Sequence, residues 1–81
     1  MADDLNGRVV NLAIGTWRDA TLHDLRQARR HIDAAMAAAD AGDPQTAAAA
    51  ASRAVQSASA GFASACGWRG AADIARLLEE T

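Results

Sequence analysis

The sequence predicts an all-α protein built around an antiparallel helical hairpin, and three observations carry this prediction. Apolar residues recur at three- and four-residue spacing through two long segments, at about 16–41 and 44–66. Between these segments, Gly42-Asp43-Pro44 combines a helix-stopping glycine, an N-cap residue and a proline suited to the first helical position. Finally, Arg53 is the single charge between Pro44 and Gly67. Because a helix with so little charge lacks an ordinary solvent face, we expect it to pack on more than one side.

Length and composition predict one helical domain over residues 1–81. Large apolar residues are few, and alanine, which makes up most of the remaining apolar content, adds helix propensity but little buried area. Chains this small with so slim a core often gain stability by association. We therefore expect a homo-oligomer, with a four-helix arrangement in each chain that is completed by dimerisation.

Shorter elements are expected on either side of the hairpin. The segment from Leu5 to Ile14 has helical spacing, although a short strand remains an alternative and Gly7 weakens both. The first long helix is expected to begin near Thr16, whose hydroxyl can act as an N-cap. After Gly67 the apolar spacing resumes and predicts a final helix of about ten residues, which must dock on the hairpin.

The spacing also predicts which residues face inward in the hairpin. On the first long helix these are Leu25, Ala28, Ile32, Ala35 and Ala39, and on the second they are Ala48, Ala51, Val55, Ala58, Phe62 and Ala65. Both sets alternate bulky and small side chains, which suits knobs-into-holes packing. The opposite flank of the second helix consists of small and mostly neutral residues, so it could receive another helix.

Charge and cysteine content restrict the function classes. The formal net charge is −2, and all eight basic residues are arginine, so the composition predicts a soluble protein without general affinity for nucleic acid or membranes. The alanine-rich, lysine-free usage is typical of a high-GC bacterium or its phage. Cys66 is alone and cannot form an intramolecular disulfide, and no apolar run approaches the roughly 18 residues that span a bilayer. We therefore expect a cytoplasmic protein.

Residues that could support chemistry are sparse. His23 and His31 stand eight residues apart, about 12 Å along one helix, so a single metal ion cannot bridge them. The sequence names no further ligands, and no cofactor site or paired nucleophile and base can be identified. These observations favour a protein that is not an enzyme.

Two segments of the first helix nevertheless carry an arginine followed five residues later by a histidine: Arg18 with His23, and Arg26 with His31. This pattern resembles the Arg-x4–6-His motif of HEPN domains, which are helical modules that often act as metal-independent ribonucleases. The resemblance implies that the arginine would stabilise the scissile phosphate. The histidine would then act as acid or base at a dimer interface. The alternative function is thus a HEPN-like ribonuclease or a nucleic-acid-binding module.

The main functional prediction is a small non-catalytic interaction or regulatory module, such as an inhibitor, an antitoxin-like protein or a phage-encoded modulator of a larger protein. It would bind a protein partner, itself or both through the neutral flank of the second helix and through two tryptophans that close the ends of the bundle. The predicted interface residues are Arg53, Gln56, Ser57, Ala60, Ser64, Trp17 and Trp68.

Overall fold

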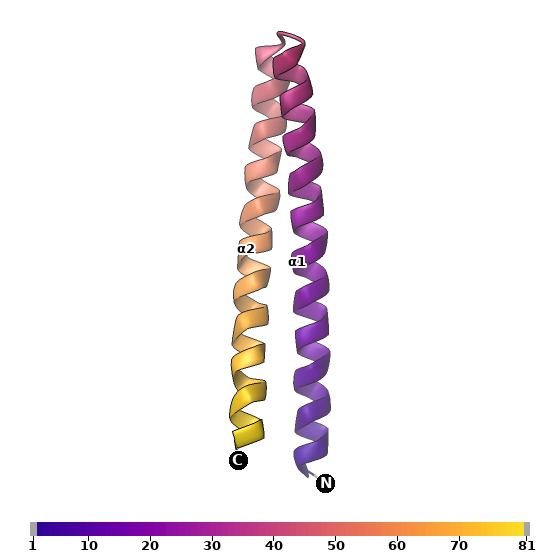
Figure 1. The fold of residues 1–81 in the computed structure, drawn as a ribbon, viewed down its shortest axis with the longest axis vertical. Coiled ribbons are helices and arrows are strands. Elements are labelled where there is room, and N and C mark those ends of the chain that lie inside the picture. Colours follow the sequence, from indigo (N-terminus) through magenta and orange to yellow (C-terminus); the bar gives the residue numbers. More distant parts are fainter. Residues whose placement is uncertain (1, 81) are drawn as a thin grey trace.

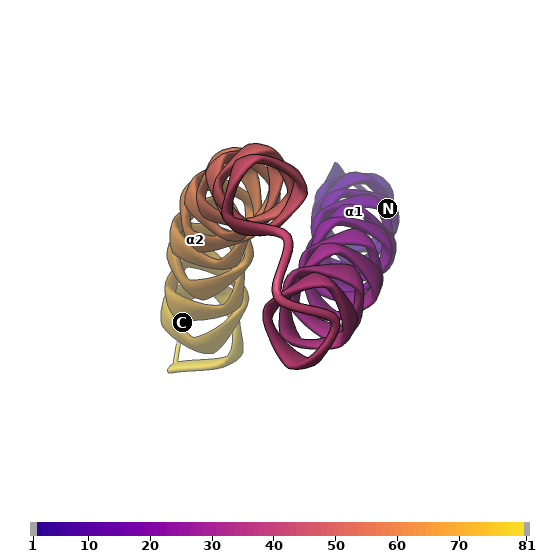
Figure 2. The same ribbon diagram turned by 90° about the horizontal axis from the view of Figure 1, so that it is seen from above.

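The chain forms two long antiparallel helices joined by a short loop. In the computed structural model, which describes residues 2–80, α1 spans Ala2–Asp40 and α2 spans Pro44–Glu80. The helices run side by side along a rod of 61 × 14 × 13 Å, with both termini opposite the loop (Figure 1). They lie closest near the loop and diverge toward the termini, as the view from above also shows (Figure 2). The predicted all-α hairpin is confirmed.

The prediction of four separate helices is wrong for the described residues. α1 continues through Gly7, Gly15 and Thr16, and α2 continues through Gly67 and Gly70, so the shorter terminal helices are extensions of the two arms. Each helical glycine costs about 1 kcal/mol relative to alanine, but none is followed by a proline or a second stop signal. Packing against the other helix compensates this cost along the rod.

The loop follows the predicted chemistry. Gly42 adopts a φ of +74°, and the amides of Gly42 and Asp43 donate to the carbonyls of Ala39 and Ala38 at 3.0 and 2.9 Å. These two bonds form a Schellman motif that ends α1. Asp43 then caps α2, because its Oδ1 accepts from the Thr46 amide at 3.1 Å and its Oδ2 accepts from the Thr46 hydroxyl at 2.6 Å.

The Asp43 cap makes the stability of the hairpin depend on pH in the acidic range. The hydrogen bonds from the hydroxyl and then the amide of Thr46 hold the pKa of Asp43 below its usual value of 3.8. Because the pKa of Asp43 is lower in the folded state, the cap contributes fully to the stability of the fold above pH 3.8. This contribution is lost as the pH falls through the folded-state pKa. We expect Asp43→Ala to melt at a lower temperature than the wild type at neutral pH, and the difference to shrink in acid.

Thermal melts followed by circular dichroism, from neutral pH to well below 3.8, measure this difference. Asp43→Asn is the control, since asparagine also caps helices but does not titrate in this range. A gap between the wild type and Asp43→Ala that stays constant in acid would contradict the assignment of the cap.

The two helices pack through a seam of mostly small residues. Seam positions recur every three and four residues on each helix, as in a coiled coil. Their residues are buried or half-buried, except Trp17 and Leu78, which are each 41% exposed. The seam residues of α1 are Gly7, Val10, Ile14, Trp17, Thr21, Asp24, Ala28, His31, Ala35 and Ala38. Those of α2 are Ala47, Ala50, Ala54, Ser57, Gly61, Ser64, Trp68, Ala71, Ala75 and Leu78. Near the loop both lists consist almost entirely of alanine and serine, which allows the close approach of the helices there.

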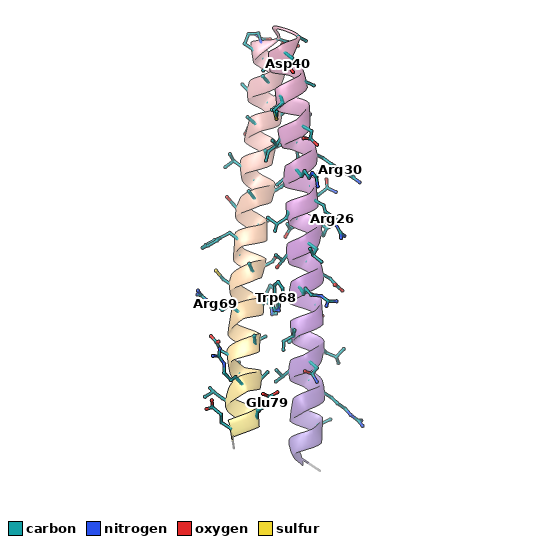
Figure 3. The ribbon with its side chains drawn as sticks, in the orientation of Figure 1. Arg26, Arg30, Asp40, Trp68, Arg69 and Glu79 are labelled. Carbon is teal, nitrogen blue, oxygen red and sulfur yellow. The ribbon has the colours of Figure 1, made fainter. Side chains whose placement is uncertain are left out.

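Three cross-helix contacts fix the register. Ser64 Oγ donates to Asp24 Oδ2 at 3.2 Å, Gly61 packs against the Leu25 side chain, and Gly67 packs against the Trp17 ring. Counting outward from these contacts places Trp17 opposite Trp68. The predicted role of the tryptophans as end plugs is therefore wrong. They lie within the seam, where Figure 3 shows Trp68 between the two helices.

The predicted inward residues are also only partly correct. Ala28 and Ala35 lie in the seam, but Leu25 and Ile32 are 47% and 48% exposed, and Phe62 is 73% exposed. The two helices instead contact each other through the neighbouring stripe, whose smaller side chains let the backbones approach closely. As a result, the fully packed part of the hairpin contains no large side chain among the described residues; its buried apolar members are all alanine.

Candidate functional site

In the half of the rod nearest the loop, large apolar side chains gather on one face. Toward the termini a second set is exposed: Leu5, Val9, Leu12, Ile74, Leu77 and Leu78. A groove of about 360 Å³ runs between the helices on the face near the loop. It is lined by Ile32, Ala35, Met36, Ala51, Ala54, Val55 and Ala58. Leu22 and Leu25 extend this surface along α1, because they occupy the same heptad positions as Met36 and Ile32. Phe62 extends it along α2 at the heptad position of Val55. We call the surface formed by Leu22, Leu25, Ile32, Met36, Val55 and Phe62 the apolar face.

The apolar face is open to solvent in the isolated hairpin. Met36 and Val55 are 61% and 65% exposed, and Leu22 is 40% exposed. Single exposed apolar residues are common, but a contiguous set with large side chains marks an interaction surface. The arrangement can bury apolar area against another chain.

Toward the termini the same face becomes basic. Arg69 and Arg76 follow Val55 and Phe62 at seven-residue intervals on α2. On α1, Arg18 precedes Leu25 by seven residues and Arg8 precedes Leu22 by fourteen. Because the seam also repeats every seven residues, these arginines lie on the face that is apolar near the loop. Arg18 is 3.6 Å from Asp19 and Arg76 is 2.6 Å from Asp73, and all four side chains are more than half exposed.

The predicted interface residues of α2 divide into two groups. Arg53, Gln56 and Ala60 are exposed, whereas Ser57 is half-buried and Ser64 is buried in the seam, where it bonds to Asp24. The exposed group lies across the seam from the apolar face. Arg53 and Ala60 directly precede the seam residues Ala54 and Gly61, while Val55 and Phe62 directly follow them. We call Arg53, Gln56 and Ala60 the neutral flank.

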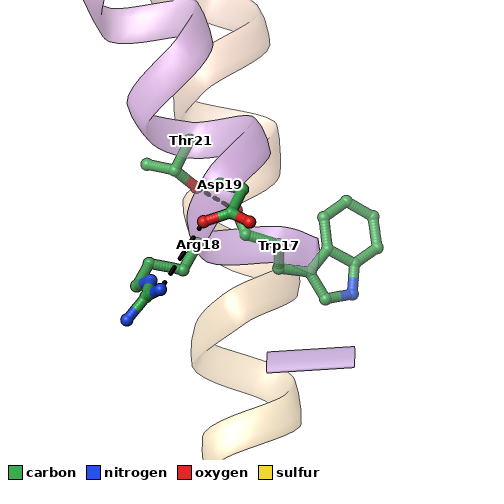
Figure 4. A network of polar contacts seen from close by, with 4 residues as sticks. All are labelled: Trp17, Arg18, Asp19 and Thr21. Carbon is green, nitrogen blue, oxygen red and sulfur yellow. Dashed lines mark hydrogen bonds and ion pairs between the residues drawn. The ribbon is translucent and has the colours of Figure 1, made fainter. Parts of the chain in front are cut away.

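The predicted interface tryptophans help to hold the hairpin together. The Trp17 ring covers Gly67 so closely that a Cβ at residue 67 would lie 2.6 Å from Trp17 Cδ2. Figure 4 shows the polar contacts around Trp17: its carbonyl accepts a 2.7 Å hydrogen bond from the Thr21 hydroxyl, and Arg18 reaches Asp19. This bond gives the hydroxyl of Thr21, which is only 4% exposed, a hydrogen-bond partner within α1.

The arginine and histidine pairs do not converge within one chain. Arg18 and His23 stand five residues apart on the continuous helix α1, as do Arg26 and His31. Five residues correspond to a rotation of about 140° around the helix, so the members of each pair point in different directions. His31 lies in the seam, while Arg26 and Arg30 project from the outer side of α1 (Figure 3). The hairpin therefore gives no support to a ribonuclease site formed by one subunit.

Among the residues whose side chains the structure describes, no three or more histidine, cysteine, aspartate or glutamate side chains are placed to hold a metal ion. Neither α1 nor α2 contains a stretch that is both long and apolar enough to cross a bilayer. Comparisons of the chain with protein-family models, curated proteins and solved structures found no match.

Proposed function

We propose that this protein is a small non-catalytic interaction module that regulates another protein by binding it, and that the apolar face takes part in its contacts. The observation that carries the proposal is the distribution of side chains in the loop half of the hairpin. There the seam consists almost entirely of alanine, glycine and serine, while Ile32, Val55 and Phe62 remain on the surface. A chain that used these residues only for its own stability would turn them toward the other helix. Aromatic and large aliphatic anchors are the residues that contribute most to protein interfaces.

The neutral flank is the second surface available to such a module. Arg53, Gln56 and Ala60 present small or uncharged side chains with one arginine, and arginine is enriched at interfaces. A chain with two usable faces can bind itself through one and a larger protein through the other. We place the module in the cytoplasm, where the exposed thiol of Cys66 would stay reduced.

Site-specific photocrosslinking in the producing cells tests this function. A benzoylphenylalanine at position 62 samples the apolar face, one at position 56 samples the neutral flank, and one at the exposed Ser59 is the control on the outer side of α2. The proposal predicts defined protein adducts at position 62, position 56 or both, and none at position 59. It predicts in addition that at least one adduct contains a protein other than this chain. Equal, diffuse labelling at all three positions would contradict it.

A further inference from the structure

We infer that a second copy of this chain covers the apolar face, and that the two copies overlap through their loop halves to form a four-helix core. The inference deepens the proposed function, on which it rests, by assigning the apolar face to self-association and leaving the neutral flank to other partners. The area that the hairpin leaves exposed, the composition of its seam and the distribution of arginine support this assignment.

The exposed area is the first argument. The chain has an accessible surface of 6051 Å² for a mass of 8.4 kDa. A compact monomer of this mass exposes about 4,600 Å², so the hairpin leaves an excess of roughly 1,400 Å². Obligate dimers commonly bury about 1,000–2,500 Å² on each subunit. The excess is spread over the whole rod, and it is large enough to include the area that one copy buries in a stable dimer.

The composition of the seam also favours a second copy. The buried apolar residues, Ala28, Ala38, Ala50, Ala54 and Ala71, remove little hydrocarbon from water when they pack. Burying Val55 and Phe62 would remove much more hydrocarbon from water for each side chain. In a two-fold symmetric dimer each of these residues is buried twice, once in each copy, because the same patch faces itself. One self-complementary contact therefore supplies the core that each hairpin lacks.

The distribution of charge selects which halves overlap. At the heptad positions of the large side chains, the loop half of this face carries one charged residue, Arg29. From Gly7 on, the terminal half carries four at these positions: Arg8, Arg18, Arg69 and Arg76. A full-length antiparallel overlap would press these arginines onto the apolar residues of the other copy, where removing charged groups from water is costly even when they are paired. Overlap of the loop halves places apolar residues against apolar residues. It also leaves the arginines in water.

Sedimentation equilibrium from about 1 µM to about 1 mM tests the inference on the full chain. The wild type should reach twice the chain mass of 8.4 kDa. The double variant Val55→Gln/Phe62→Gln should raise the dimer dissociation constant on the order of 100-fold or more, since four buried apolar side chains are lost. The matched control Arg53→Gln/Ala60→Gln introduces the same residue at two exposed positions across the seam and should leave the constant within about threefold.

Cysteine cross-linking keeps the inference testable if the double variant fails to fold. In a Cys66→Ser background, Ala58→Cys lies in the groove, and Ala72→Cys occupies the equivalent heptad position in the terminal half. A short bismaleimide should link two chains through position 58 and not through position 72. Linking through position 72 alone, or a wild type that stays monomeric at the highest concentration, would overturn the inference.

The result also separates this inference from the proposed function. A monomeric protein that still forms an adduct with another protein through position 62 would overturn self-association and leave the interaction function standing. A dimer that forms through position 58, without any adduct to another protein, would support the inference and remove the regulatory function. Loss of the dimer in Arg53→Gln/Ala60→Gln, with the Val55→Gln/Phe62→Gln dimer intact, would place self-association on the neutral flank and overturn the inference.

Discussion

Ala50→Leu is expected to destabilise the hairpin by about 1–3 kcal/mol, because it enlarges a side chain where the helices lie closest. Ala50 is 7% exposed and stands opposite Ala35 in the seam near the loop. A leucine there must push the helices apart or leave its rotamer minimum. Leucine and alanine have similar helix propensities, so the loss cannot be attributed to the helix itself. For a chain of this size, each kcal/mol corresponds to a fall in melting temperature of about 4–8 °C.

The neighbouring substitution Ala49→Leu provides the control. Ala49 is exposed, so the same side chain meets water and should change the stability by no more than about 0.5 kcal/mol. Urea unfolding at one fixed protein concentration gives both values. A larger loss for Ala49→Leu than for Ala50→Leu would show that the helices pack through a different stripe.

Gly67→Ala is the second substitution with a large expected effect. A Cβ at position 67 would lie 2.6–2.8 Å from three atoms of the Trp17 ring, so the rigid indole or the whole of α2 must move. Alanine gains about 1 kcal/mol of helix propensity over glycine, but overpacking in a fitted site costs typically 1–3 kcal/mol. We expect the clash to dominate, with a net loss on the order of 1 kcal/mol and a melting temperature lower by several degrees.

Gly70→Ala isolates the contribution of propensity, since nothing lies within 4 Å of a Cβ at that position. This variant should be more stable than the wild type by about 0.5–1 kcal/mol. In a Trp17→Leu background the clash is removed, so Gly67→Ala should cost less stability there than in the wild type. Equal stabilisation by Gly67→Ala and Gly70→Ala would mean that Trp17 does not cover Gly67.

The parts of the fold that depend on local chemistry could be predicted from the sequence. Gly42 and Asp43 act through their own backbone and their immediate neighbours, and both behave in the structure as expected. The continuation of α1 through residue 15 and of α2 through residue 67 could not be predicted in this way. Gly15 and Gly67 weaken a helix without ending it, and contacts with the other helix decide whether the helix continues.

The candidate surface was harder to predict because α2 carries two stripes with the same period. Ala54 and Gly61 repeat at seven residues, and so do Val55 and Phe62 directly after them. Periodicity indicates that both stripes are suited to packing, but it does not say which one meets α1. The sequence favoured the stripe with the larger side chains. The structure uses the smaller one, and the larger residues become the surface that we assign to a second chain.

The oxidation rate of Met36 by dilute peroxide, measured by mass spectrometry of its peptide over a range of protein concentrations, tests the central claim most directly. Met36 is 61% exposed in the isolated hairpin and lines the groove of the apolar face. The account predicts rapid oxidation in dilute solution, and increasing protection over the concentration range in which the sedimenting mass doubles. Slow oxidation at every concentration while the chain remains a monomer would contradict it, because Met36 would then be buried within a single chain.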